Sequence, residues 1–302
     1  MESFLSGLGT KIADKWLTAL ALPGLLFVGF VLLSWTKGTS FSTLVAGANT
    51  ASAELRGAGA IAVVLAVVAV LLLSSAAALA AYGLGFLILR AWLGQWPAPF
   101  AALSRGLTEA RQKRWTDADD AMAEQLEDDR DATDKVNSLA AVRNRIALSY
   151  PACPTWIGDR AHSVDVRIWH AYRLDLGAAW PRLWLVLEEG VRTEVIAARD
   201  AFQRAGTLAG WAVLYLALMF CWWPLGAFSG LSATIALLAG AGTGVTAWSR
   251  ARAAIASYAD LTEAAVDLNA HKLAVGLDVL AETDKFTRET GSQVMRLIRK
   301  GT

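Results

Sequence analysis

The side chains that could carry out chemistry are concentrated between Tyr150 and Leu183 of this 302-residue chain. A membrane enzyme acting on lipids would need Asp, Glu and His grouped in one place, where they could exchange protons with a substrate. His162 and His170 are eight residues apart, which separates them by about 80° around a helix and does not give an i, i+4 metal pair. The candidates for a catalytic group are Asp159, His162, Asp165, His170 and Asp175.

Recognisable catalytic motifs are missing from the sequence. It has no P-loop, no glycine-rich turn after a strand, no H-E-x-x-H helix and no serine at a nucleophile elbow. Cys153 is predicted on a cytoplasmic segment and Cys221 within a membrane span, so neither a disulfide nor a metal site is expected. We therefore predict a protein that is not an enzyme and that uses no cofactor and no metal.

A strongly acidic run lies in the middle of the chain, within residues 101–149, which are predicted to be helical. The acids of this run are Asp117, Asp119, Asp120, Glu124, Glu127, Asp128, Asp129, Asp131 and Asp134. The run lacks the D-x-[DN]-x-[DN]-G loop that folds around calcium, so a solvated helix face is favoured over a cation site. Sparse apolar positions indicate an exposed arm rather than a buried core. The net charge of +1 gives no reason to expect nucleic acid as a partner.

The candidate residues and the acidic run lie between long stretches of sequence without charged side chains. Residues 205–249 contain no charged side chain and are interrupted by Trp222-Trp223-Pro224, and similar stretches cover residues 16–36 and 57–89. The core of a bilayer is about 30 Å thick and needs roughly 20 apolar residues of helix. We therefore predict an all-α protein with four membrane spans, the last two joined as a hairpin.

The distribution of basic residues predicts the orientation in the membrane, because cytoplasmic loops carry an excess of Lys and Arg. Of the 28 Lys and Arg residues, only Lys37 and Arg56 fall in the two predicted outer loops. Both termini and the central segment are therefore expected in the cytoplasm. The spans contain no ionisable Asp, Glu, Lys, Arg or His. This disfavours an ion-coupled carrier or a proton pump, which normally needs such groups inside the membrane.

Four regions follow from this pattern. They are an N-terminal hairpin over residues 1–100, with spans near 16–36 and 57–89, a cytoplasmic helical region over 101–204, a second membrane hairpin over 205–249, and a C-terminal cytoplasmic helix over 250–302. The third and fourth spans are expected to continue as helices outside the membrane, the third from near Trp180 and the fourth past Leu268. A heptad-like coiled-coil seam is predicted from Tyr258, Leu261, Ala265, Leu268, Lys272, Val275 and Val279.

The second span is rich in small side chains, which let helix backbones approach closely in lipid. Its candidate pore-lining or packing face consists of Ala62, Ala66, Ala69, Ser74, Ser75 and Ala78. The general abundance of alanine in this chain is an alternative explanation of the pattern. Together with the coiled-coil seam, the small-residue face favours a homo-oligomer.

The segment 154–183 resembles a motif of uncharacterised bacterial multi-pass membrane proteins, especially those of actinobacteria. The family pattern is roughly P-T-x-L-G-N, then Y-G-x-D, then W-P-R-L, and the match covers about 30 of the 302 residues. The chain departs from it at Asp159, where the family has Asn, and at Arg173, where it has Gly. The resemblance implies four spans, a cytoplasmic middle segment and a bacterial plasma membrane, and it transfers no activity. The candidate functional segment is marked by Pro154, Thr155, Gly158, Asp159, Tyr172, Asp175, Trp180, Pro181 and Arg182.

Two functions remain open at this stage. The first is a pore or channel formed by several copies of the chain, because pores can be lined by small or apolar residues. The second is a membrane-anchored scaffold that presents the acidic arm and residues 154–183 to a protein partner. The expected partners are membrane lipid, further copies of the chain and, for the scaffold, a cytoplasmic protein.

Overall fold

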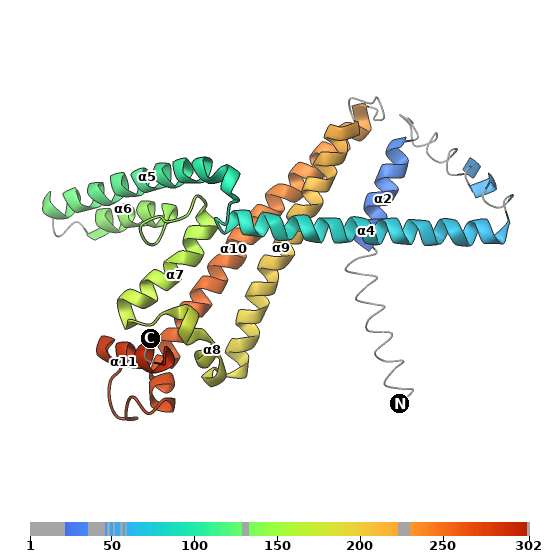
Figure 1. Cartoon of the computed structure of the whole chain (residues 1–302). Coiled ribbons are helices and arrows are strands. Elements are labelled where there is room, and N and C mark those ends of the chain that lie inside the picture. The colour runs from blue at the N-terminus through green and yellow to red at the C-terminus, as the bar shows by residue number, and fades with distance from the viewer. Residues whose placement is uncertain are drawn as a thin grey trace, which may run out of the picture. The chain divides into compact units, whose positions relative to one another are not determined.

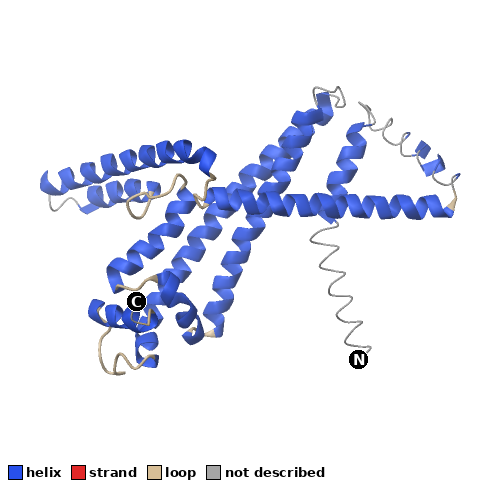
Figure 2. Cartoon of the chain, viewed as in Figure 1, coloured by secondary structure: helices blue, strands red, loops and turns tan. Residues whose placement is uncertain are grey.

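The computed structural model describes residues 22–35, several positions between 46 and 57, residues 59–128, 133–222 and 230–300 (Figure 1). Every element in these ranges is a helix, which confirms the all-α prediction (Figure 2). The elements are α2 (Leu22–Trp35), α4 (Ala60–Trp92), η2 (Ala98–Phe100), α5 (Ala101–Asp128), α6 (Thr133–Ile146), α7 (Trp156–Tyr172), α8 (Leu176–Val186), α9 (Glu189–Trp222), α10 (Gly230–Gly276) and α11 (Arg288–Ile298).

The chain forms two compact units. The first unit contains residues 1–88 and 204–248, and the second contains residues 89–203 and 249–302. Helices α9 and α10 contribute residues to both units, as expected of helices that continue beyond a membrane span.

Two described helices, α4 and residues Glu189–Cys221 of α9, are long and apolar enough to cross a membrane, judged by length and composition. They correspond to the predicted second and third spans. The part of the predicted first span that is described forms the shorter helix α2, and residues 16–21 lie outside the described residues. The uncharged residues of the predicted fourth span lie in α10. The four-span arrangement and the location of the termini stay predictions.

Helix α4 exposes most of its large apolar side chains. Only 6% of its most apolar window is buried inside the structure. Leu65, Leu72 and Leu79 are each about 60% exposed, and Ile61 is 78% exposed. A helix in a soluble core would bury these groups, so the surface of α4 requires an apolar neighbour beyond the described residues, such as lipid or another protein.

Small residues bring the helices of the first unit close together. The buried face of α4 consists of Ser74, Ala78, Ala81 and Gly85. A Cβ on Gly210 of α9 would lie 1.9 Å from the carbonyl oxygen of Ala81, and one on Gly24 of α2 would lie 2.2 Å from that of Ser74. The helices thus meet backbone to backbone, as in small-xxx-small contacts.

The predicted small-residue face of α4 is only partly buried. Ser74 and Ala78 are buried, Ala62, Ala66 and Ser75 are partly buried, and Ala69 is exposed. The buried stripe continues at Ala81 and Gly85, beyond the predicted set. It covers one face of the C-terminal two-thirds of the helix, where α2 and α9 lie.

The core of the second unit lies among α7, α8, α10 and α11. Its fully buried members include Ile168 of α7, Leu183 of α8, Val266 of α10 and Val294 of α11. The core holds these four helices together, and no described strand contributes to it.

The predicted coiled-coil seam of α10 does not coincide with the face that this helix buries within the chain, because Leu268 is 75% exposed. Ala265 is buried, as expected, but the buried face also includes Val266, Ala270 and Leu273. These residues pack on α7, α8 and α11 of the same chain. The buried face of α10 is therefore rotated away from Leu268. Its small members, Ala265 and Ala270, let α10 lie close to its neighbours.

One long helix from Trp180 to Trp222 was expected, and this is wrong. Helix α8 ends at Val186 and α9 begins at Glu189, because Leu187 adopts an extended conformation with φ −70° and ψ 143°. The Leu187 side chain is buried in the core. Glu189 in the first turn of α9 also favours a helix start at this point, since acidic groups stabilise helix N-termini.

Candidate functional site

Thr155, the second residue of the candidate segment, is the N-cap of α7. Its Oγ1 accepts a hydrogen bond from the Gly158 backbone N–H at 3.0 Å and donates one to the Trp92 carbonyl. A Cβ on Gly158 would lie 2.8 Å from Cys153 Cβ and 3.0 Å from the Leu93 carbonyl oxygen. Thr155 and Gly158 therefore fasten the start of α7 to the last residues of α4 and those that follow it.

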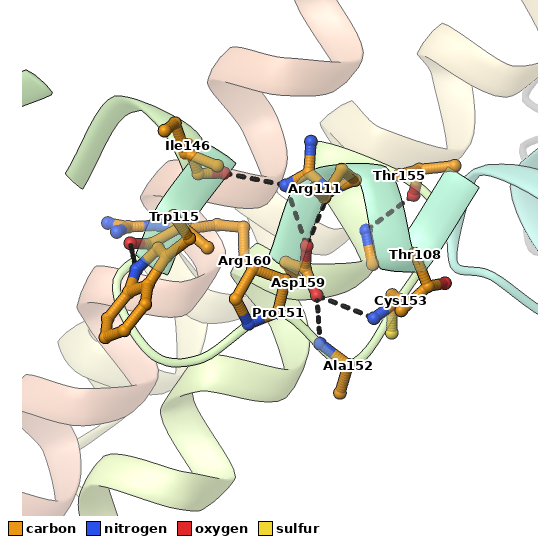
Figure 3. A network of polar contacts seen from close by, with 12 residues as sticks. Thr108, Arg111, Trp115, Ile146, Pro151, Ala152, Cys153, Thr155, Asp159 and Arg160 are labelled. Atoms are coloured by element: carbon orange, nitrogen blue, oxygen red, sulfur yellow. Dashed lines mark hydrogen bonds and ion pairs between the residues drawn. The ribbon is translucent and has the colours of Figure 1, made fainter. Parts of the chain in front are cut away.

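Asp159 is the most deeply buried acid of the segment, with 2% of its side chain exposed. Its Oδ2 accepts from Arg111 Nε at 2.9 Å and lies 2.7 Å from Arg111 Nη2. Its Oδ1 accepts from the backbone N–H groups of Ala152 at 2.9 Å and Cys153 at 2.7 Å. We call this group, shown in Figure 3, the Asp159 clamp.

The Asp159 carboxylate has no acceptor capacity left for other chemistry. An ionised carboxylate offers about four lone-pair sites, and the four contacts of the clamp use all of them. A general base or a metal ligand needs a free lone pair that points toward its substrate or ion. The geometry therefore makes Asp159 a group that fixes the chain rather than one that reacts.

The clamp also fixes the base of an arm formed by α5 and α6, which lie side by side (Figure 1). Arg111 Nη2 donates to the Ile146 carbonyl at 2.7 Å, and Trp115 Nε1 donates to the Ala147 carbonyl at 3.1 Å. Gln112 Nε2 donates to the Pro151 carbonyl at 2.9 Å. Three side chains on adjacent turns of α5 thus bind the last residue of α6 and the chain that follows it (Figure 3).

Cys153 lies beside the clamp but is poorly suited to act as a nucleophile. Burial raises the pKa of its thiol, the charge of Asp159 raises it further, and the nearby Arg111 guanidinium opposes this. Because the thiolate is the reactive form, a raised pKa leaves the thiol protonated at neutral pH. Its side chain instead packs near Gly94, whose φ of 84° suits a residue without a Cβ.

The remaining candidate residues hold α8 and α11 in place. Asp175 caps α8 by accepting from the Ala178 N–H at 3.4 Å, and it pairs with Arg299 at 2.6 Å. The Arg299 hydrogen bond is the main reason that the pKa of Asp175 is lowered. Pro181 lies inside α8, because the helix already begins at Leu176 after its Asp175 cap. Arg182 Nη1 donates to the Ala178 carbonyl at 2.9 Å.

Tyr172 closes α7 at the other end of the segment. Burial, followed by a hydrogen bond to Asp267 and the charges of Asp267 and Glu263, raises the pKa of its phenol to about 12. A Cβ on Gly291 of α11 would lie 1.8 Å from the Tyr172 carbonyl oxygen, so α11 touches the backbone there. Tyr172 therefore holds α11 against α7 and remains protonated at any physiological pH.

A cavity of about 260 Å³ opens between α7, α8 and α10 in the second unit. Two residues of the candidate segment, Trp180 and Pro181, form part of its wall together with Asp165. The other wall residues are Ala161, Val164, Leu176, Gly177, Tyr258, Ala259 and Thr262. The wall is thus mostly apolar, with one carboxylate.

The five residues considered for a catalytic group are not all brought together, although His162 and Asp175 lie near enough to Asp165 for their charges to act on its pKa. Asp159 belongs to the clamp, Asp165 to the cavity and Asp175 to the cap of α8. His162 and His170 lie on the exposed surface of α7. Within the described residues, no three His, Cys, Asp or Glu side chains are placed to hold a metal ion.

Sequence reasoning missed Arg111 and the cavity. Nothing local marks Arg111 in the sequence, because its partner Asp159 lies 48 residues away. The cavity depends on Tyr258, Ala259 and Thr262 of α10, which are more than 70 residues from α8 in the sequence. Comparisons with protein-family models, curated proteins and solved structures found no match to this chain.

Proposed function

We propose that this protein is a membrane-anchored scaffold whose α5–α6 arm presents a binding surface to a protein partner. The observation that carries the proposal is the fixed base of the arm. There, Arg111, Gln112 and Trp115 donate hydrogen bonds to backbone carbonyls at the end of α6 and just after it. An arm held in one orientation loses less conformational entropy on binding than a mobile one. The exposed apolar surface of α4 supports a membrane anchor.

The arm carries charge that its own residues do not neutralise. Asp117, Asp120 and Glu124 are exposed, and their spacing places them on one face of α5. Asp119, on a different face, pairs with Arg143 at 2.8 Å. No ion pair of the described residues involves the other three acids. A partner with a basic surface would complement this stripe and would bind faster at low salt.

The test is site-specific crosslinking in cells, with a photoreactive residue at Ala121, which is exposed between the acids. We expect one discrete protein adduct that is lost when Asp117, Asp120 and Glu124 are changed to their amides. A matched control changes the exposed Glu194 and Glu282, outside the arm, to Gln and should leave the adduct intact. Absence of any adduct, or an adduct that survives loss of the acids, would contradict the proposal.

A homo-oligomeric pore is the second candidate, and the exposed apolar face of α4 favours it, because further copies could cover that face. Of the expected lining, Ser74 and Ala78 are covered within one chain, whereas Ala69 is exposed. A pore would therefore use only part of the expected lining. Purified protein that stays monomeric in mild detergent and carries no current in planar bilayers would exclude the pore and leave the scaffold standing.

A further inference from the structure

The cavity between α7, α8 and α10 has a mixed lining that suits a small ligand. Its volume of about 260 Å³ lies just below the usual range of small-molecule pockets, which is about 300–1,000 Å³. Val164, Leu176 and Pro181 give it apolar walls, and the aromatic side chains of Trp180 and Tyr258 also line it. Such a lining stabilises an apolar ligand body through burial.

Asp165 is the one carboxylate in this lining, and it forms no ion pair within the described residues. The neighbouring arginines of α7 are engaged elsewhere, since Arg160 pairs with Asp260 and Arg167 with Glu263 at 2.9 Å. No described ion pair or hydrogen bond uses the Asp165 carboxylate.

The surroundings of Asp165 penalise its charge. Burial is the main cause that raises its pKa, and the charge of Asp175 adds to this, opposed only by His162 on the preceding turn of α7. The side chain of Asp165 is nevertheless exposed, so a ligand can reach its carboxylate from solvent. A cation that binds beside it would offset the penalty on its charge.

We propose that this cavity binds a small apolar molecule that carries a single protonated amine, with its ammonium group beside Asp165 and its apolar body between Trp180 and Tyr258. The site is separate from the arm and does not depend on the scaffold function. An ammonium group would donate hydrogen bonds to the carboxylate, and aromatic faces attract cations.

Other ligand classes fit the lining less well. An anion would meet the Asp165 carboxylate and no positively charged lining residue. A divalent metal ion prefers several oxygen ligands, and the lining supplies only one carboxylate. The Thr262 hydroxyl donates to the Tyr258 carbonyl at 2.7 Å, so its hydrogen is already used. A neutral apolar molecule would fit the walls but would leave Asp165 unpaired.

The experiment measures binding of three probes of similar size and shape to the full-length protein in detergent by isothermal titration calorimetry. They are 3-phenylpropylamine, neutral 3-phenylpropanol and anionic 3-phenylpropionate. We expect saturable binding of the amine, binding of the alcohol at least about tenfold weaker, and no binding of the carboxylate. One charge-assisted hydrogen bond accounts for a difference of about this size.

Two variants and a control assign the binding to the cavity. Asp165→Asn should weaken amine binding about tenfold or more and leave the weak binding of the alcohol unchanged. Ala161→Leu should fill the cavity and weaken both. Asp120→Asn makes the same chemical change on the exposed arm and should change neither. Thermal melting of each variant shows that it is folded.

Three results would overturn the proposal. The first is no saturable binding of the amine by the wild-type protein. The second is equal binding of the amine and the alcohol, because the carboxylate would then contribute nothing. The third is amine binding that persists unchanged in folded Asp165→Asn.

Discussion

At the scale of single residues, the pairing of Arg111 with Asp159 is the clearest case of a charge that must be matched. Asp159 is 2% exposed and Arg111 is 19% exposed, so both groups are largely removed from water. Such a pair need not add net stability relative to apolar residues. Removal of one partner is different, because it leaves the other charge buried and uncompensated.

We therefore predict that Arg111→Met lowers the free energy of unfolding by about 3–5 kcal/mol, the usual cost of breaking a buried pair. The measurement is thermal or denaturant unfolding of the purified protein in detergent. The double variant Arg111→Met/Asp159→Asn should recover part of this loss, because no unpaired charge remains.

The control for this prediction is Arg143→Met, which breaks a more exposed pair with Asp119. It should cost about 1 kcal/mol or less in charge pairing, since exposed ion pairs contribute little. Equal losses for Arg111→Met and Arg143→Met would mean that the clamp does not hold the structure together.

Asp165 should make folding stability depend on pH. Its pKa in the folded protein is raised above the ordinary value, so the folded state binds the proton more tightly than the unfolded state does. Stability is therefore reduced above the folded-state pKa and recovers as the pH falls through it toward the unfolded value near 4. Asp165→Asn should raise the melting temperature at pH 7.

This gain in melting temperature should vanish near pH 3, where the wild-type carboxyl is also neutral. Melting curves of both proteins at the two pH values measure it. Asp120→Asn, on the exposed arm, should show no gain at either pH. A gain of equal size at pH 3 and pH 7 would mean that the charge of Asp165 is not its cause.

At the scale of the helices, the first unit depends on glycines where two backbones touch. A methyl group on Gly210 would have to displace the Ala81 carbonyl oxygen, which is backbone and cannot rotate away. We predict that Gly210→Ala destabilises the protein by about 1–3 kcal/mol or more, the range of overpacking changes. Thermal unfolding of the purified protein in detergent measures this loss of stability.

Gly83→Ala on α4 is the matched control for this change, because a Cβ at Gly83 meets nothing within 4 Å. It should be neutral or should stabilise the helix by roughly 0.5–1 kcal/mol, the ordinary difference between the two residues in a helix. If both changes had the same effect, helix propensity rather than close approach would explain the glycines.

Local sequence features indicate where some helices begin, but they do not indicate helix ends and buried faces that depend on residues distant in the sequence. The Thr155 cap is visible in the local sequence, because its partner Gly158 lies only three positions away. The end of α8 at Val186 was missed, because nothing near Leu187 forbids a helix and its burial in the core decides its conformation. The buried face of α10 was misplaced for the same reason, since Leu268 looks apolar but faces away from the core.

In the candidate site, too, the sequence marks individual residues but not the distant residues that they contact. Asp159 was selected from its motif, but its role depends on Arg111, which comes from another helix. Trp180 and Pro181 were selected too, yet the cavity they line is completed by Tyr258, Ala259 and Thr262 of α10. Periodicity could not predict these contacts, because it reports the faces of one helix and not its neighbours.

At the scale of the whole molecule, the apolar exposure of α4 and the composition of α9 lead to a prediction about the membrane. The protein should stay in the membrane fraction after washing at alkaline pH and should be released only by detergent. Fractionation followed by immunoblotting measures this. Release by alkali alone would mean that the apolar surface is covered by another protein rather than by lipid.

The stripe of small residues on α4 has a consequence for sequence variation. The Leu and Val side chains that face outward are held by no specific partner within the described chain, so any residue of similar hydrophobicity can replace them. Ser74, Ala78, Ala81 and Gly85 leave no space for growth. A scan of all substitutions along α4 would then show a tolerance that rises and falls with each turn of the helix, with intolerant positions at 74, 78, 81 and 85.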